Sequence, residues 1–180
     1  MMTADEAESL LKSFRKKPLF DEGALPVRWR YGAREIEQLI PHRPPMRMVD
    51  TLRGYDPEAG LIAGGRFLDP ADPVFSGHFP GFPVYPGNLT VESIGQLGLC
   101  MFYFAASGKT AIDAAAKPAQ ARATRIRGAL FIEPLLPGEE VVLLAKKLTL
   151  DPFGASVIGQ AIVRGKVAVV CIGEVILLEG

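Results

Sequence analysis

Cysteine, histidine and tryptophan are scarce in this sequence of 180 residues, and neither sign of charge is in excess. The 20 Lys and Arg residues balance the 20 Asp and Glu residues, so no net field attracts polyanions. No segment is dense in Lys and Arg with interleaved aromatic residues, which argues against a nucleic-acid partner. The longest apolar stretches, such as 167–172, fall far short of the ~20 residues that span a bilayer. We therefore expect no membrane span.

The two cysteines are Cys100, in an apolar helical stretch, and Cys171, in an apolar strand pattern. Both fit buried, reduced thiols in a reducing compartment, and neither suggests a disulfide or a metal site. The first residues are acidic and polar, where a signal peptide would need a basic start and an apolar run. These features predict a cytoplasmic protein.

Hydrophobic residues make up 48% of the chain and charged residues 22%, which is typical of a globular domain with an ordinary core. Residues 3–17 form an amphipathic helical pattern, after which Pro18, Gly23 and Pro26 interrupt any regular element. We therefore predict an N-terminal extension over residues 1–34 and one domain over residues 35–180.

Within that domain the pattern predicts an α+β fold in which an antiparallel sheet wraps around one long apolar helix. The helix spans 86–107, and Glu92 is its only charged residue, so it is expected to be buried nearly all round. Before it, residues 69–87 hold five prolines and three glycines, which favours an irregular but stiff loop without a helix. The other predicted elements are a helix at 33–40, a hairpin of strands 46–55 and 61–68, and four consecutive antiparallel neighbours at 125–133, 140–150, 155–164 and 167–178.

Asn88, Glu92 and Gln96 are spaced four residues apart, so they form one polar stripe on the long helix. A carboxylate inside a core is costly without a partner or a task. The stripe is therefore either an edge that faces solvent or the lining of a cavity, and the spacing alone leaves both interpretations open.

His78 stands in the stiff loop that leads into this helix. A lone histidine in such a loop is most often a hydrogen-bonded turn residue, but Glu92 follows within the first turns of the helix. A histidine and a carboxylate are the minimum for general base and general acid catalysis. The unpaired backbone N–H groups of the first turn, that of Gly87 among them, are suited to bind an oxygen that gains negative charge.

Three segments carry a resemblance to a known family. Residues 77–96, GHFPGFPVYPGNLTVESIGQ, closely resemble the active-site segment of the 3-hydroxyacyl-acyl-carrier-protein dehydratases of the FabZ type. Residues 40–50, IPHRPPMRMVD, resemble the Leu-Pro-His-Arg opening of that family, and residues 131–139, FIEPLLPGE, resemble its later Pro-Gly bend. The resemblance covers roughly residues 35–178.

The resemblance implies a lyase that dehydrates a (3R)-3-hydroxyacyl thioester to the trans-2-enoyl thioester. Position by position, His78 matches the base, Glu92 the acid, and Gly87 the amide that binds the thioester carbonyl. Val84 matches a backbone carbonyl that orients the histidine, and Gln96 matches a glutamine that hydrogen-bonds the acid. A glutamate at position 92, where the FabA type has aspartate, implies that the product double bond is not isomerised.

The resemblance also implies a hotdog fold, a homodimer or dimer-based oligomer with sites between subunits, acyl carrier protein as the partner, and no cofactor or metal. Asn88 and Thr90 stand where the family usually has apolar residues, so we include both among the substrate-binding candidates. Phe82 and Glu133 also depart from the family pattern. These departures leave open whether the pathway is fatty-acid synthesis or a specialised lipid, polyene or polyketide route.

Two other functions stay open. A hotdog thioesterase would use a carboxylate to activate water against the same thioester carbonyl, and an inactive accessory subunit would only bind acyl chains. We interpret His42, in the second segment, as structural. Arg122, Arg125 and Arg127 suit either the acidic carrier protein or a solvated strand edge.

Overall fold

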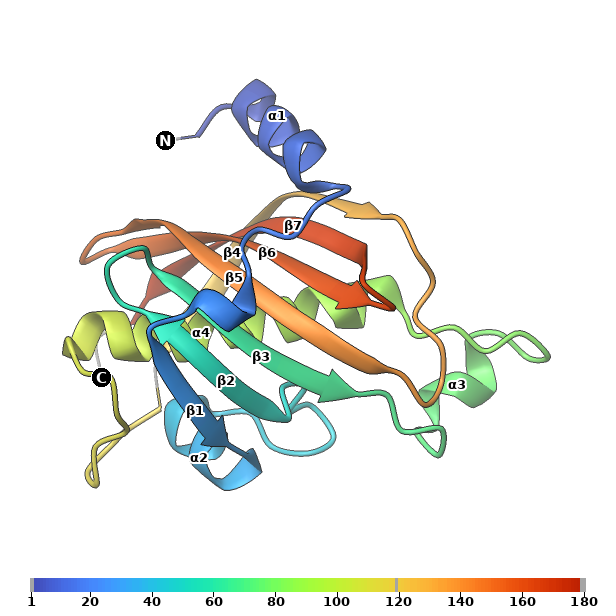
Figure 1. Cartoon of the computed structure of the whole chain (residues 1–180), viewed down its shortest axis with the longest axis horizontal. Coiled ribbons are helices and arrows are strands. Elements are labelled where there is room, and N and C mark those ends of the chain that lie inside the picture. Colours follow the sequence, from blue (N-terminus) through green and yellow to red (C-terminus); the bar gives the residue numbers. More distant parts are fainter. Residues whose placement is uncertain (1, 119, 179–180) are drawn as a thin grey trace.

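A computed structural model describes residues 2–118 and 120–178 of the chain. Its helices are α1 (Ala4–Phe14), the 3-10 turn η1 (Glu22–Ala24), α2 (Ala33–Leu39), α3 (Val74–Gly77) and α4 (Gly87–Ser107). Its strands are β1 (Val27–Tyr31), β2 (Thr51–Asp56), β3 (Leu61–Phe67), β4 (Ala121–Phe131), β5 (Glu140–Leu150), β6 (Gly154–Val163) and β7 (Lys166–Leu177). The sheet curves around α4, and α1 lies against its other face (Figure 1).

The long helix α4 forms the core, as predicted. It begins directly after Pro86, whose fixed φ suits an entry into a helix, and it is followed by Gly108 in the left-handed conformation with φ of 65°. Leu97 and Phe104 are among its fully buried side chains. The sheet approaches closely, since a Cβ on Gly159 of β6 would stand 2.2 Å from the side chain of Ile94. This wrapped helix confirms the hotdog fold.

By length and composition α4 could cross a membrane, because it is apolar on average although its uninterrupted apolar runs are short. However, 56% of its most apolar 18-residue window is buried inside the protein. Its apolar character is therefore explained by its place beneath the sheet.

The strand order is β1-β2-β3-β5-β6-β7-β4, and every neighbouring pair is antiparallel. The predicted hairpin of β2 and β3 is confirmed, with Gly60 in its turn at φ of 63°. The prediction that four consecutive strands are neighbours is wrong for the first of them, because β4 pairs with β7 and not with β5. Both edges of β5 are already paired, one with β3 and the other with β6. After β4 ends, the chain still bonds to β7, because the backbone N–H groups of Ile132 and Glu133 both donate to the Ala168 carbonyl.

Three further local predictions differ from the structure. Residues 46–50 are not part of β2: Met46 and Met48 bond to Gln96 of α4, and Asp50 bonds to β3 just before β2 begins. The stiff loop contains the one-turn helix α3, which begins directly after Pro73, and a proline is tolerated at the start of a helix. Residues 27–31 form the edge strand β1 where no regular element was expected; its alternating burial is the pattern of a half-covered strand.

Within the predicted N-terminal extension, α1 packs on the outer face of the sheet, whereas β1 is part of the sheet itself. Ala7 and Leu11 of α1 are buried, and the side-chain amide of the fully buried Gln160 on β6 bonds to the end of α1 and to the chain that follows it. Gln160 Nε2 donates to the carbonyls of Phe14 and Lys17, at 2.6 and 2.9 Å. The division after residue 34 stays a prediction, but this segment has defined contacts with the domain.

Candidate active site

His78 is held by a reciprocal pair of hydrogen bonds across its loop. The backbone N–H of Val84 donates to the His78 carbonyl at 2.8 Å, and Nδ1 of the imidazole lies 2.8 Å from the Val84 carbonyl. Because a carbonyl oxygen only accepts, Nδ1 carries the proton in this contact. In the neutral ring this contact leaves the lone pair on Nε2, which is the tautomer that a general base requires.

The loop between these two residues is closed by a tight turn. The backbone N–H groups of Phe79 and Phe82 each donate to the carbonyl of the other, at 3.3 and 3.0 Å. Gly81 within the turn has φ of 81°, a conformation that disfavours any side chain. Pro80 within the turn and Pro83 directly after it stiffen it further, so the imidazole is placed by a rigid segment.

A cavity of about 420 Å³ opens beside His78, at the N-terminal end of α4. The residues that line it come from the histidine loop, from the first turns of α4, from the end of β4 with the segment that follows it, and from β7. They are His78, Val84, Tyr85, Gly87, Asn88, Thr90, Phe131, Glu133, Pro134, Leu135 and Val169. Burial raises the pKa of the Tyr85 phenol, so this side chain stays uncharged. The cavity has the mainly apolar lining that suits an acyl chain.

The start of α4 supplies unpaired N–H groups to this cavity. The N–H groups of Leu89 and Thr90 both donate to the Pro86 carbonyl, while those of Gly87 and Asn88 have no acceptor in the described part of the chain. Such groups at the positive end of the helix dipole favour a partly negative oxygen. A Cβ on Gly87 would stand 2.5 Å from the Phe131 ring, so a larger residue there would displace this ring.

Asn88 and Thr90 line the same cavity, but part of their bonding capacity is used locally. The Thr90 hydroxyl donates to the Pro86 carbonyl at 3.3 Å, and Asn88 Oδ1 accepts from the Leu89 N–H at 3.1 Å. The Asn88 side-chain amide donors have no recorded acceptor among the described residues, and this residue is exposed. Asn88 therefore offers donor groups to a ligand, whereas Thr90 mainly offers its methyl group.

Glu92 lies elsewhere on α4. It stands one helical turn after Asn88, further from the start of the helix and its cavity. Glu92 Oε1 accepts a hydrogen bond from Gln96 Nε2 at 2.8 Å, and the same oxygen lies 3.5 Å from His42 Nε2. Neither Glu92 nor Gln96 is among the residues that line the His78 cavity.

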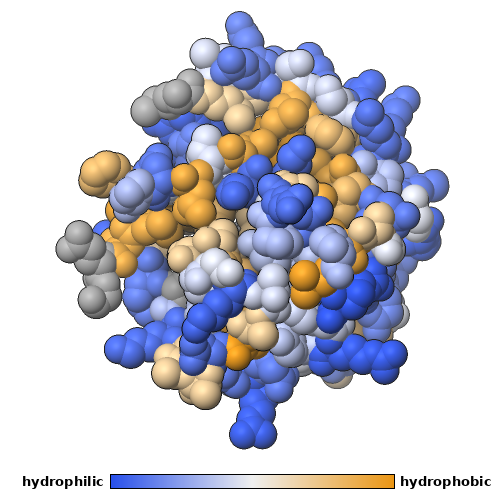
Figure 2. Space-filling view, turned by 60° about the vertical axis from the view of Figure 1, so that its left-hand side comes forward, coloured by the Kyte–Doolittle hydropathy of each residue, from blue (hydrophilic) through white to orange (hydrophobic). Residues whose placement is uncertain are grey.

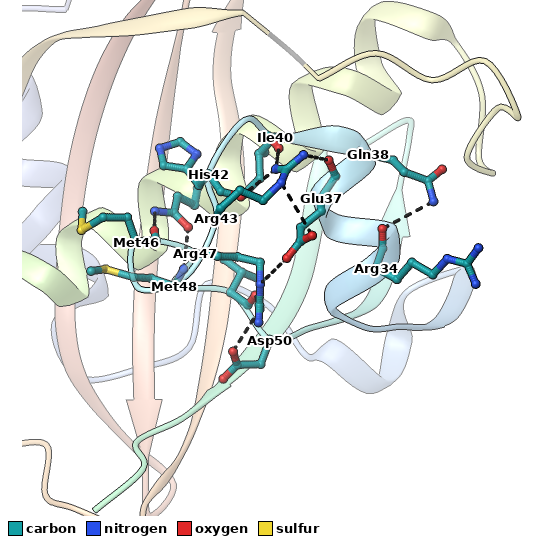
Figure 3. Close-up of polar contacts among 12 residues, drawn as sticks. Arg34, Glu37, Gln38, Ile40, His42, Arg43, Met46, Arg47, Met48 and Asp50 are labelled. Atoms are coloured by element: carbon teal, nitrogen blue, oxygen red, sulfur yellow. Dashed lines mark hydrogen bonds and ion pairs between the residues drawn. The ribbon is translucent and has the colours of Figure 1, made fainter. Parts of the chain in front are cut away.

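Gln96 links the carboxylate to the loop that precedes β2. The Gln96 side chain is 1% exposed; its Nε2 also donates to the Met46 carbonyl at 2.8 Å, and its Oε1 accepts from the Met48 N–H at 2.7 Å. Figure 3 shows this loop beside α2, with His42, Met46 and Met48 on the side toward α4. The loop is therefore attached to the same helix face as the carboxylate.

The predicted site residues thus fall into two groups in one chain. His78, Val84, Gly87, Asn88 and Thr90 share one cavity, and the second group is formed by Glu92 and Gln96. The polar stripe is consequently divided: its first member faces the cavity and its other two members bond to each other.

His42 is the residue whose position the sequence did not predict. It was interpreted as structural, but its imidazole faces Glu92 across 3.5 Å. The feature of the sequence that points to His42 is the resemblance of residues 40–50 to the family motif. Spacing alone does not place that segment beside α4. Phe131, which covers Gly87, was likewise not predicted.

The sheet wrapped around α4, with a histidine loop at the start of that helix and a carboxylate further along it, defines a hotdog-fold protein of the dehydratase class. The chain belongs to the FabA-like family, whose model, described as a FabA-like domain, matches residues 40–174.

Curated relatives agree with this assignment, and a solved structure agrees with the fold. The chain is 33% identical over 148 residues to the 3-hydroxyacyl-[acyl-carrier-protein] dehydratase FabZ of Aeromonas hydrophila, covering 79% of this chain and 90% of that one. It is also 33% identical over 134 residues to the protein of the same name from Geotalea uraniireducens, covering 74% and 88%. A chain of the dehydratase heterocomplex ApeI:P from Xenorhabdus doucetiae matches the fold with a TM-score of 0.63 at 16% identity, covering 80% of this chain and 91% of that chain.

Proposed function

We propose that the protein is a hydro-lyase that removes water from a (3R)-3-hydroxyacyl thioester on acyl carrier protein and forms the trans-2-enoyl thioester. One observation carries the proposal: the Val84 carbonyl holds His78 Nδ1 at 2.8 Å, which leaves Nε2 free beside a cavity that also contains the Gly87 N–H. The activity named for the curated relatives from two bacteria supports the same reaction.

The residues have distinct roles in this reaction. His78 Nε2 takes the proton from C2 of the substrate, and the electron pair of that C–H bond forms the new double bond. The Gly87 N–H binds the thioester oxygen as it gains negative charge. Glu92 gives a proton to the hydroxyl on C3, which leaves as water when the C–O bond breaks. The protons balance, since one moves to His78 and one leaves Glu92.

The working unit is proposed to be a dimer, because one chain keeps Glu92 away from the His78 cavity. Strand β4 is one of the two edge strands of the sheet, and both Ile126 and Phe131 on it are 60% exposed. Figure 2 shows that exposed apolar side chains gather in patches on one face of the molecule. A second copy that meets this chain across a two-fold axis would cover apolar surface and supply its own Glu92.

Acyl carrier protein is the proposed partner, and the cytoplasm is the proposed location. Arg122 and Arg125 are exposed on the edge strand, where they can meet an acidic protein or a phosphate, while Arg127 is paired with Glu174. Cys100 and Cys171 are buried free thiols, as suits a reducing compartment.

The cavity also bears on the pathway. Asn88 and Glu133 place polar groups on its wall, and Glu133 lies 3.7 Å from Lys166 and 3.9 Å from Arg164. A cavity wall with an amide and a carboxylate is poorly matched to an acyl chain that is saturated along its whole length. We therefore favour a substrate of a specialised lipid, polyene or polyketide pathway, with a polar or unsaturated group near this wall.

The test is to incubate the purified protein with 3-hydroxyacyl thioesters of graded length and unsaturation and to weigh the products. An enoyl thioester that has lost one water supports the proposal. A free acid would instead identify a thioesterase. Binding of the acyl thioester without turnover on any substrate would identify an accessory subunit.

A further inference from the structure

We propose that His42 is a positioning residue for Glu92: it donates a hydrogen bond to one carboxyl oxygen and so directs the acidic proton to the other. This inference rests on the proposed role of Glu92 as the acid. It gives a catalytic role to the segment 40–50, which otherwise has no role in the proposed reaction.

Both neighbours of the Glu92 side chain contact the same oxygen. Gln96 Nε2 donates to Oε1 at 2.8 Å, and His42 Nε2 lies 3.5 Å from Oε1. No contact to Oε2 is recorded among the described residues. The carboxyl group is therefore asymmetric, with one oxygen as an acceptor and the other free to carry and release a proton.

The burial of the His42 ring determines which nitrogen can donate. Its Nδ1 is buried and has no hydrogen-bond partner in the described part of the chain, and the side chain as a whole is 26% exposed. A proton on Nδ1 would leave a buried N–H without an acceptor, whereas a proton on Nε2 points at Glu92. The geometry therefore favours the Nε2–H tautomer, the opposite of the tautomer at His78.

The distance of 3.5 Å between His42 and Glu92 is long for a hydrogen bond, but catalytic contacts are often long without substrate and shorten when it binds. Glu92 is the more exposed partner, with 40% of its side chain accessible against 26% for His42. A rotation of the carboxyl group toward the ring would complete the bond without moving the backbone.

The loop that carries His42 is rigid enough to set this direction. Arg43 donates from Nη1 to the His42 carbonyl at 2.8 Å and from Nη2 to the Glu37 carbonyl at 3.0 Å. Arg47 Nε lies 3.3 Å from the Glu37 carboxylate, and its Nη1 donates to Asp50 at 3.2 Å. Figure 3 shows these side chains between α2 and the loop, on the side away from the His42 ring. The backbone that carries the ring is therefore held from the side of α2, and the ring itself faces Glu92 on α4.

The consequence for catalysis concerns the chemical step. With His42 in place, Oε1 is occupied as an acceptor and the proton sits on Oε2, in position for the leaving hydroxyl. Without it, the exposed carboxyl group samples other orientations, and a smaller fraction of complexes is ready to react. We expect kcat to fall and KM to stay nearly constant, because the lost contact matters only when the proton moves.

The first test observes the tautomer directly and needs no activity. The chain has two histidines, so long-range ¹H–¹⁵N correlation spectra of the wild-type protein and of His78→Ala assign both rings. The proposal predicts a proton on Nε2 of His42 and on Nδ1 of His78. A proton on Nδ1 of His42 would overturn it.

The second test compares two substitutions in the active wild-type background. His42→Gln keeps an N–H donor near the position of Nε2, whereas His42→Phe keeps the ring volume without a donor. We expect kcat to fall about 10-fold in His42→Phe, the scale of one hydrogen bond, and to remain within about 3-fold of wild type in His42→Gln. Equal losses in both variants, or none in His42→Phe, would contradict the proposal.

A combination with Glu92→Gln separates positioning from a general structural effect. If His42 acts through the acid, His42→Phe should lower the residual activity of Glu92→Gln by less than about 2-fold, because the acid is already missing. An undiminished 10-fold loss there would overturn the inference. Failure of the proposed function is distinguishable, since the wild-type protein would then dehydrate no 3-hydroxyacyl thioester.

Discussion

Gln96→Leu removes the amide that joins α4, Glu92 and the loop before β2, while it keeps nearly the same side-chain size. The Met48 N–H loses the Gln96 acceptor at 2.7 Å, and Met48 is buried. A buried donor without an acceptor costs about 1–3 kcal/mol. Met46 is 47% exposed, so water can replace the bond to its carbonyl at a cost of about 0.5–1 kcal/mol.

The sum is a loss of about 1.5–4 kcal/mol in the free energy of unfolding, which lowers Tm by about 3–16 °C for a chain of this length. Glu92 also loses the donor that holds Oε1, so kcat should fall about 10-fold. Scanning calorimetry measures the first effect, and dehydration of a saturating 3-hydroxyacyl thioester measures the second.

Gln38→Leu is the matched control, because it makes the same chemical change on the surface of α2. Gln38 Nε2 donates only at 3.4 Å to the Arg34 carbonyl, at an exposed site (Figure 3). We expect the free energy of unfolding to change by less than about 0.5 kcal/mol and kcat to stay at the wild-type value. If both variants melt at the wild-type temperature, the Gln96 bonds do not stabilise the loop and the reasoning is wrong.

Two further predictions concern the cavity and the thiols. Asn88→Val combined with Thr90→Ile should shift relative kcat/KM toward saturated acyl chains, which a substrate panel measures; an unchanged profile removes both residues from the specificity argument. Burial raises the pKa of Cys100 and of Cys171 to about 12, so both stay protonated far above neutral pH. An aromatic disulfide reagent at pH 8 should therefore label neither thiol in the native protein and both in denaturant, and rapid native labelling would contradict the burial.

The elements with a strong local pattern could be predicted from the sequence. Helix α4 was expected at 86–107 because its apolar character is nearly continuous and a proline marks its start. Strand β5 was predicted with its observed bounds, and the turn with Gly60 identified the β2–β3 hairpin. In each case neighbouring residues contain the information.

The parts that depend on distant partners could not be predicted in this way. The pairing of β4 with β7 is decided by which edges β5 leaves free. Residues 46–50 have the composition of a strand, but Gln96 takes the Met48 N–H that a strand partner would need. The contact of His42 with Glu92 joins positions 50 residues apart through a loop that has no periodic pattern.

The most direct test of the central claim, that His78 and Glu92 form one site across a dimer, uses two inactive variants. His78→Ala and Glu92→Gln should each lower dehydration by about 10²-fold or more, because each removes the base or the acid. The reverse hydration should fall equally, since both directions share one transition state. Calorimetry should show that both variants remain folded.

The two variants are then unfolded and refolded together, and mixed dimers are confirmed by native mass spectrometry. In a mixed dimer one site carries both lesions, and the other pairs an intact His78 with an intact Glu92. Random mixing gives about half mixed dimers with one working site of two, so the recovered activity should approach about a quarter of wild type. Confirmed mixed dimers that stay inactive would contradict the claim that the two residues of a site come from different chains.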